Sequence, residues 1–249
     1  LDASLQLQLT DAVAETSAQA LTLALDEDPG SVQAHGGLDL DLTAEARREG
    51  EATVVTIVVT DTRGEDRAID LDLSLPLDLT GWRCWDDINR SQVNAVDAKL
   101  TERRYPLVVV TNAEAGLCLA VEPGQPFAYE LRADAEGLTL HAPLGLTPAG
   151  TGEVKSRAEL RVYLFPTDAR WGFRDAMARY YRLFPEAFKR RAMAEGMWLF
   201  AFQNSDLTNP SHYAYHEGGP GGWEYDEERG IGTYPYTEVS SRTVHVPRL

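Results

Sequence analysis

The sequence contains only two cysteines, Cys84 and Cys118. One pair cannot build the disulfide framework of a small secreted protein, and both cysteines lie in strand-like segments, so free thiols are predicted. Neither has a second cysteine or a histidine at ligand spacing, which argues against a thiolate metal site. No metal and no cofactor are expected.

Long apolar runs and basic residues are also scarce. No stretch of about 18 apolar residues occurs, so no membrane span is expected. The chain begins at Leu1 without the charged and apolar regions of a signal peptide, and none is recognised. Lysine and arginine number 23 against 39 acidic residues, for a net charge of −16. Because an acidic surface repels phosphate backbones, nucleic acid is not expected as a partner.

Several functional signatures are missing. The sequence has no G-x-S-x-G elbow, phosphate-binding glycine loop or dinucleotide fingerprint, so serine hydrolase, kinase and dehydrogenase activities are unsupported. No D-x-D-x-D-G calcium loop occurs. His212 and His216 are four residues apart, but the H-E-x-x-H order is absent and Pro210 and the nearby glycines disfavour a helix. A zinc site is therefore not expected.

The first 165 residues alternate between apolar and polar positions. Apolar residues make up 43% of the chain, enough for a hydrophobic core. Such alternation predicts strands with one buried and one solvated face. The alternating positions are Leu5, Leu7 and Leu9; Leu21, Leu23 and Leu25; Leu38, Leu40 and Leu42; and Ile69, Leu71, Leu73, Leu75 and Leu77.

The solvated faces explain much of the acidic excess. Residues 1–150 contain 26 acidic and 10 basic residues, whereas residues 151–249 contain 13 of each. The pairs Asp39 with Asp41 and Asp70 with Asp72 are interpreted as solvated sheet faces rather than calcium ligands. The β-branched segment Thr53 to Val59 is predicted to be more deeply buried.

Further strands are predicted at 106–111, 117–121, 127–133, 137–142 and 156–165. Many strands with no helix between them favour a mainly β fold, with an antiparallel β-sandwich over residues 1–166. The segment Gly81 to Asp87 contains Trp82 and Trp85. These rings are interpreted as filling the edge of the sandwich core, with a stacking platform for a ligand as the alternative.

The pattern changes near residue 167. Aromatic and apolar residues recur at helical spacing from Trp171 to Phe184, so a helix is predicted there, with Thr167 or Asp168 as its cap. Pro185 ends that helix and suits the first turn of a second short helix over 186–191. Residues 167–196 are therefore expected to form a helical linker.

The last 53 residues hold the candidate site. Met197 to Phe202 is predicted to form a short strand buried on both faces, and the polar segment 203–238 is predicted to be a functional loop. The aromatic rings of segment 203–238 offer flat faces for ligands, and its carboxylates can bind hydroxyls or move protons. The predicted catalytic residues are Glu217 and Asp226, and the predicted substrate-binding residues are His216, Trp223, Glu224, Tyr225 and Glu238.

Several motifs together resemble those of bacterial glycoside-hydrolase-like proteins, in which a galactose-mutarotase-like β-supersandwich precedes a (β/α)8 barrel. The motifs are Trp171 to Phe188, Glu195-Gly-Met-Trp-Leu-Phe, His216-Glu217 and Asp226 to Glu238, with Gly81 to Asp87 and the segment from Tyr105 fitting the sandwich.

The resemblance implies that residues 197–249 are the first strand and loop of an incomplete α/β barrel, whose strand-to-helix loops form the catalytic face. A barrel takes about 250 residues, so the chain is expected to be a piece of a longer protein.

Three functions are left open. In the first, the chain is part of a glycoside hydrolase-like protein that acts on a polysaccharide or glycoconjugate, and this fragment alone is expected to be inactive. The second is a non-catalytic β-sandwich module with a carbohydrate-binding or structural role. The third is a subunit that needs the remainder of its own polypeptide or another protein chain. Carbohydrate is the expected partner, and an extracellular or cell-surface location follows only from that substrate class.

Overall fold

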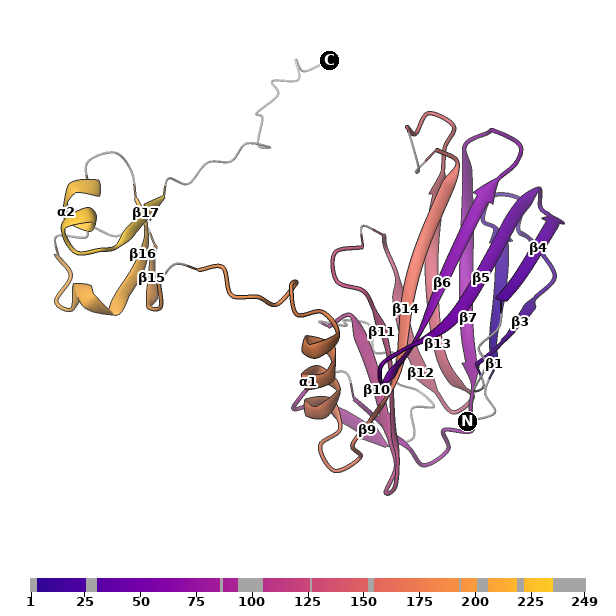
Figure 1. Cartoon of the computed structure of the whole chain (residues 1–249), viewed down its shortest axis with the longest axis horizontal. Coiled ribbons are helices and arrows are strands. Elements are labelled where there is room, and N and C mark those ends of the chain that lie inside the picture. The colour runs from indigo at the N-terminus through magenta and orange to yellow at the C-terminus, as the bar shows by residue number, and fades with distance from the viewer. Residues whose placement is uncertain are drawn as a thin grey trace, which may run out of the picture. The chain divides into compact units, whose positions relative to one another are not determined.

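The computed structural model describes residues 4–25, 31–85, 87–93, 105–125, 127–151, 155–192, 194–200, 206–218 and 222–234, without the side chains of 33–37. The chain divides into two compact units, Leu1–Phe188 and Lys189–Leu249, which are described separately (Figure 1). Among the described residues, no helix is long and apolar enough to cross a bilayer.

The first unit is the antiparallel β-sandwich that the alternation predicted (Figure 1). Its six-stranded sheet has the order β12-β13-β7-β1-β2, with β3 also paired to β1. The members of this sheet are β1 (Ser4–Asp11), β2 (Thr16–Ser17), β3 (Leu21–Ala24), β7 (Arg67–Pro76), β12 (Glu130–Asp134) and β13 (Gly137–Leu146).

The second sheet of this unit has eight strands, in the order β4-β5-β6-β14-β11-β10-β8-β9. The members of this sheet are β4 (Ser31–Gly37), β5 (Leu40–Glu49), β6 (Ala52–Asp61), β8 (Arg83–Trp85), β9 (Ser91–Val93), β10 (Leu107–Thr111), β11 (Gly116–Val121) and β14 (Arg157–Thr167). Every pairing described in both sheets is antiparallel.

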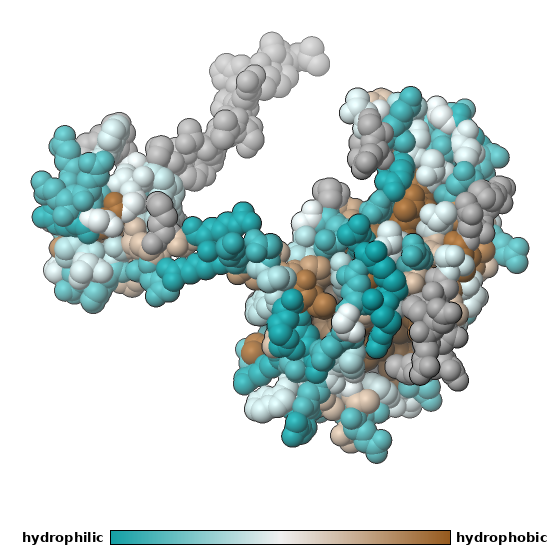
Figure 2. All heavy atoms as spheres, viewed as in Figure 1, coloured by the Kyte–Doolittle hydropathy of each residue, from teal (hydrophilic) through white to brown (hydrophobic). Residues whose placement is uncertain are grey.

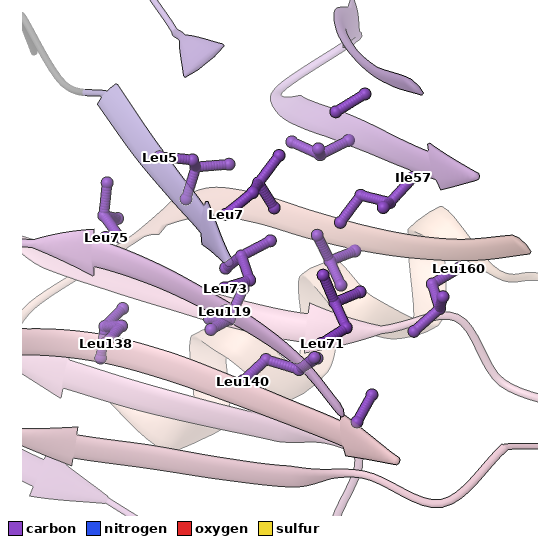
Figure 3. Close-up of a cluster of buried hydrophobic side chains, with 14 of the residues drawn as sticks. Leu5, Leu7, Ile57, Leu71, Leu73, Leu75, Leu119, Leu138, Leu140 and Leu160 are labelled. Carbon is purple, nitrogen blue, oxygen red and sulfur yellow. The ribbon is translucent and has the colours of Figure 1, made fainter. Parts of the chain in front are cut away.

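Aliphatic side chains from both sheets pack against one another in the space between them (Figure 3). Leu7 and Leu73 come from the six-stranded sheet, and Ile57, Leu119 and Leu160 come from the eight-stranded sheet. Alternate residues on the outer face of β7 stay solvated, as expected: Asp72 is exposed. Hydrophilic residues accordingly cover much of the visible surface (Figure 2).

The helix α1 (Phe173–Leu183) covers the outer face of the eight-stranded sheet and forms a second core with it. This explains the deep burial predicted for β6: Val55 and Ile57 face the inter-sheet core, whereas Val54 packs in the core beneath α1. Tyr180 of α1 donates its hydroxyl hydrogen to the Val121 carbonyl at 2.7 Å. Burial from both sides thus produces a continuous rather than alternating apolar strand.

The two cysteines are buried and free, as predicted. Cys118 lies in the core beneath α1, and burial raises the pKa of its thiol well above the usual value. Trp82 packs against the inter-sheet core, and Trp85 packs beneath α1 with its Nε1 donating to Thr111 Oγ1 at 3.0 Å. These contacts favour the core interpretation of both rings; Asp86 lies outside the described residues.

Two predictions about the helical region were wrong. The helix begins at Phe173, after Gly172, so neither Thr167 nor Asp168 caps it. Instead, Thr167 Oγ1 donates to the Gly172 carbonyl and Asp168 Oδ1 accepts the Arg170 amide hydrogen, which holds the tight turn before the helix.

The second helix predicted over 186–191 does not form in the described residues; the chain turns there. Phe188 folds back onto the rings of Tyr180 and Tyr181, at centroid distances of 5.6 and 4.5 Å. These aromatic contacts replace the helical hydrogen bonds that the sequence pattern suggested.

The described part of the second unit contains a parallel sheet in the order β15-β16-β17. Its elements are β15 (Met197–Phe200), the 3-10 helix η4 (Pro210–His212), β16 (Tyr213–Glu217), α2 (Trp223–Glu228) and β17 (Gly232–Tyr234). The predicted loop 203–238 therefore contains two strands and a helix, and that prediction is corrected. The many glycines and polar residues around β16 concealed its short alternation.

The double burial predicted for Met197 to Phe202 is also corrected. In β15 only Leu199 is buried, whereas Trp198 and Phe200 are 53% and 61% exposed. The strand lies at an edge of the described sheet, and Met197 is exposed as well, so Leu199 is the one covered side chain of this strand. Residues 201 and 202 lie outside the described residues.

Candidate functional site

A buried histidine–carboxylate contact joins β16 to α2. His216 Nδ1 lies 2.7 Å from Asp226 Oδ2, and the two side chains are 4% and 0% exposed. Thr233 of β17 donates its hydroxyl hydrogen to the same Asp226 oxygen at 2.6 Å. One carboxylate therefore ties together the helix and two strands of the parallel sheet.

The local backbone explains how this contact is built. Gly218 follows β16, and a Cβ at that position would lie 2.8 Å from Cε1 of His216, so glycine lets the backbone lie directly against the imidazole. At the end of α2, the Ile231 amide hydrogen is donated to the Asp226 carbonyl at 2.9 Å. This bond turns the chain from the helix into β17 and brings Thr233 to the carboxylate.

Glu217 lies on the other face of the sheet. Side chains alternate along a strand, so Glu217 points away from the face that carries His216 and Asp226. It is half-buried and is the last residue of β16. In register with it are Phe200 of β15 and Tyr234 of β17, each also at the carboxyl end of its described strand.

The preceding row on this face consists of Trp198, Tyr215 and Gly232. The Trp198 and Phe200 rings lie 5.5 Å apart, centroid to centroid. We call this the aromatic face, defined by Trp198, Phe200, Tyr215, Glu217 and Tyr234. By register it places four rings and one carboxylate on the same side of the sheet.

The remaining predicted residues lie on or near α2. Trp223 is 54% exposed at the start of the helix, and Glu224 beside it is exposed. The Arg229 guanidinium carbon lies 3.5 Å from the centre of the Tyr225 ring, so that ring has an intramolecular cation partner. Glu238 lies outside the described residues.

The structure thus brings His216 and Asp226 together but places Glu217 on the opposite face from Asp226. The catalytic roles given to Glu217 and Asp226 stay predictions. Sequence reasoning missed Thr233 and the aromatic partners of Glu217 on β15 and β17. The signal for the latter was the spacing of two residues between Trp198 and Phe200, which places both rings on one face of a strand.

Within the described ranges, no group of three or more His, Cys, Asp or Glu side chains is arranged to hold a metal ion. The chemistry that the arrangement offers is that of an accessible carboxylate among rings, with a buried histidine–carboxylate contact behind it. Such a carboxylate can accept hydrogen bonds from hydroxyls or transfer a proton.

No protein-family model matches the sequence, and no curated protein matches it. Among solved structures, the chain is similar to a polysaccharide lyase, with a TM-score of 0.42 and 11% identity, over 72% of this chain and 27% of the lyase. It is similar to a putative aldose 1-epimerase from Escherichia coli, with a TM-score of 0.35 and 8% identity, over 58% of this chain and 64% of the epimerase.

An alpha-N-acetylgalactosaminidase from Bifidobacterium bifidum is also similar, with a TM-score of 0.34 and 10% identity, over 72% of this chain and 39% of that chain. The chain therefore spans less than two thirds of the length of each of these three proteins.

Proposed function

We propose that the chain is part of a glycoside hydrolase-like, carbohydrate-active protein and that its aromatic face binds a polysaccharide or glycoconjugate. The observation that supports this is the row Phe200, Glu217 and Tyr234 at the carboxyl ends of three parallel strands. In open α/β sheets, ligands bind outside the carboxyl ends of the strands. The row therefore lies where such a sheet offers a ligand site.

The chemistry of the aromatic face suits a sugar. Trp198 and Phe200 expose more than half of their surface, so their flat apolar faces are accessible to the C–H surface of a pyranose ring. Glu217 lies between rings on both neighbouring strands and can accept hydrogen bonds from sugar hydroxyls. Rings and carboxylate together bind the two kinds of surface that every sugar presents.

For hydrolysis, Glu217 is the carboxylate that faces the substrate. Cleavage of a glycosidic bond uses two carboxyl groups on either side of the bond. Asp226 is fully buried against His216 and Thr233, so in this proposal it positions the histidine instead of contacting the sugar. The second carboxyl group then comes from another part of a longer protein.

Binding is tested with the 249-residue chain by affinity electrophoresis through gels that contain soluble polysaccharides. Trp198→Ala and Phe200→Ala are expected to weaken retention about tenfold, as truncation of a ligand-contacting ring does. Trp171→Ala is the matched control, because Trp171 is 58% exposed but belongs to the first unit. Equal retention of all three variants and the unmodified chain would exclude the aromatic face as the binding site.

Catalysis is tested in the longer polypeptide that contains this chain. Glu217→Gln is expected to lower the rate of glycan cleavage at least about a hundredfold while retention on the gel persists. An unchanged rate would remove Glu217 from the chemistry. Retention without any cleavage by the unmodified polypeptide would instead favour the non-catalytic carbohydrate-binding module.

A further inference from the structure

The inter-sheet core of the first unit is not filled at one end. A cavity of about 510 Å³ lies there, within the usual size range of small-molecule sites. Its walls come from both sheets and are mainly aliphatic: Leu75 belongs to β7 and Leu77 follows it, whereas Leu117 and Leu164 belong to β11 and β14. Trp82 adds a flat aromatic wall.

One positively charged residue, Arg48, lines this cavity. Along β5, Leu42, Ala44 and Ala46 face the inter-sheet core, and Arg48 follows on the same side of the strand, where it is exposed at the edge of the cavity. Arg48 Nη1 donates to the Thr53 hydroxyl at 2.9 Å, and both residues line the cavity. Among the described residues, the Arg48 guanidinium makes this hydrogen bond to a neutral hydroxyl and no ion pair with a carboxylate.

Asp78 is the other charged residue at the cavity. Its carboxylate accepts the Thr80 amide hydrogen at 3.0 Å, and hydrogen bonds from the Thr80 hydroxyl and amide lower the pKa of Asp78. Asp78 therefore stays ionised at neutral pH and is exposed to solvent. The cavity presents one guanidinium and one carboxylate, both on solvent-exposed residues at its edge, and aliphatic surface between them.

We propose that this cavity binds a small amphipathic carboxylate whose apolar body occupies the space between the sheets and whose carboxylate pairs with Arg48. Apolar walls favour an acyl chain over a polyhydroxylated sugar, because buried hydroxyls would lack hydrogen-bond partners along those walls. A guanidinium whose contact is a neutral hydroxyl can still take a carboxylate in a charge-assisted, bidentate geometry. This site is separate from the aromatic face and does not depend on its proposed function.

The proposal is tested by isothermal titration of the 249-residue chain with decanoate, kept below the concentration at which it forms micelles. Saturable binding of one decanoate per chain is expected, and Arg48→Met should weaken it at least about tenfold. Arg47→Met is the matched control, because Arg47 pairs with Glu49 at 2.6 Å on the outward face of the same strand. Equal affinities for decanoate and neutral 1-decanol would overturn the pairing with Arg48.

Two further variants keep the test decisive if Arg48→Met disturbs folding. Asp78→Asn should tighten decanoate binding, because it removes the like charge near the ligand. Ala115→Trp should abolish binding, because Ala115 is exposed and lines the cavity, so a large ring there fills its mouth. Undiminished binding by the folded Ala115→Trp variant would show that decanoate binds elsewhere and would overturn the proposal.

Discussion

Arg67 of β7 and Asp61 of β6 form an ion pair between the two sheets of the sandwich, with Nη1 3.0 Å from Oδ1. The second guanidinium nitrogen, Nη2, donates to Asp11 Oδ2 at 2.8 Å. The Arg67 side chain is only 5% exposed, and that of Asp61 is 0% exposed. Because Arg67 begins β7 and Leu75 lies near the other end of that strand, the ion pair and the cavity lie at opposite ends of the inter-sheet core.

Replacing Arg67 by Met should destabilise the first unit strongly. The substitution leaves Asp11 and Asp61 without their cation, and removing one partner of a buried pair costs about 3 kcal/mol or more of the free energy of unfolding. Urea denaturation measures the loss. The control is Arg63→Met, whose solvent-exposed pair with Asp39 should contribute far less to stability. Equal losses in both variants would contradict the structural role of Arg67.

Acid should destabilise the same end of the core. Backbone hydrogen bonds from Ala14 and the bond from Arg67 lower the pKa of Asp11 below its usual 3.8. For Asp61, burial raises the pKa, but hydrogen bonds from the Gly64 and Glu65 amides and the charge of Arg67 outweigh it, so that pKa is lowered too.

A carboxyl pKa that is lower in the folded chain than in the unfolded chain stabilises the fold above the unfolded value. That contribution is lost as the pH falls from about 4 through the folded values. Urea unfolding between pH 2 and 7 should therefore show a free energy of unfolding that declines below about pH 4. Asp11→Asn and Asp61→Asn should flatten this decline, and a decline of unchanged slope in both variants would contradict the assignment.

Gly137 should tolerate no side chain. It begins β13 with a φ of 149°, and a Cβ there would lie 2.1 Å from the Leu75 carbonyl oxygen. Gly137→Ala should therefore lower the free energy of unfolding by at least about 2 kcal/mol. Gly145→Ala on the same strand is the control, because its Cβ would meet nothing within 4 Å, and a change below about 1 kcal/mol is expected. Similar stabilities for the two variants would show that the hairpin accommodates the alanine.

The sandwich could be predicted because its signal is local and repeated. In β1 and β7 the leucines at every second position face one core, and the intervening positions face solvent. The sequence of each strand therefore indicates which of its faces is buried. The core between α1 and the eight-stranded sheet was harder to predict from the sequence. Its helix α1 was predicted from spacing, but only the structure shows that Tyr180 reaches the Val121 carbonyl, 59 residues earlier in the chain.

The candidate site was only partly predictable, because its strands are short. β16 has five residues and β17 has three, too few for periodicity to separate a strand from a loop. The acidic residues of the segment were recognised, but their surroundings depend on contacts between separate elements. Glu217 and Asp226 look equivalent in the sequence, yet one lies among rings and the other is buried against His216.

Asp226→Asn should loosen the parallel sheet of the second unit. The carboxylate oxygen that accepts the Thr233 hydroxyl hydrogen and contacts His216 Nδ1 loses its charge, and a buried hydrogen bond to a charged group contributes about 1.5 to 3 kcal/mol. Hydrogen exchange of the β16 and β17 amides should accelerate about tenfold or more, while exchange in β7 stays unchanged.

The matched control for this variant is Glu224→Gln, an equivalent change on the exposed side of α2 that should leave exchange as it was. Unchanged protection in Asp226→Asn would show that packing alone holds α2 and the strands together. That result would contradict the proposed positioning role of Asp226. Accelerated exchange in that variant alone would tie the placement of His216 to this buried carboxylate.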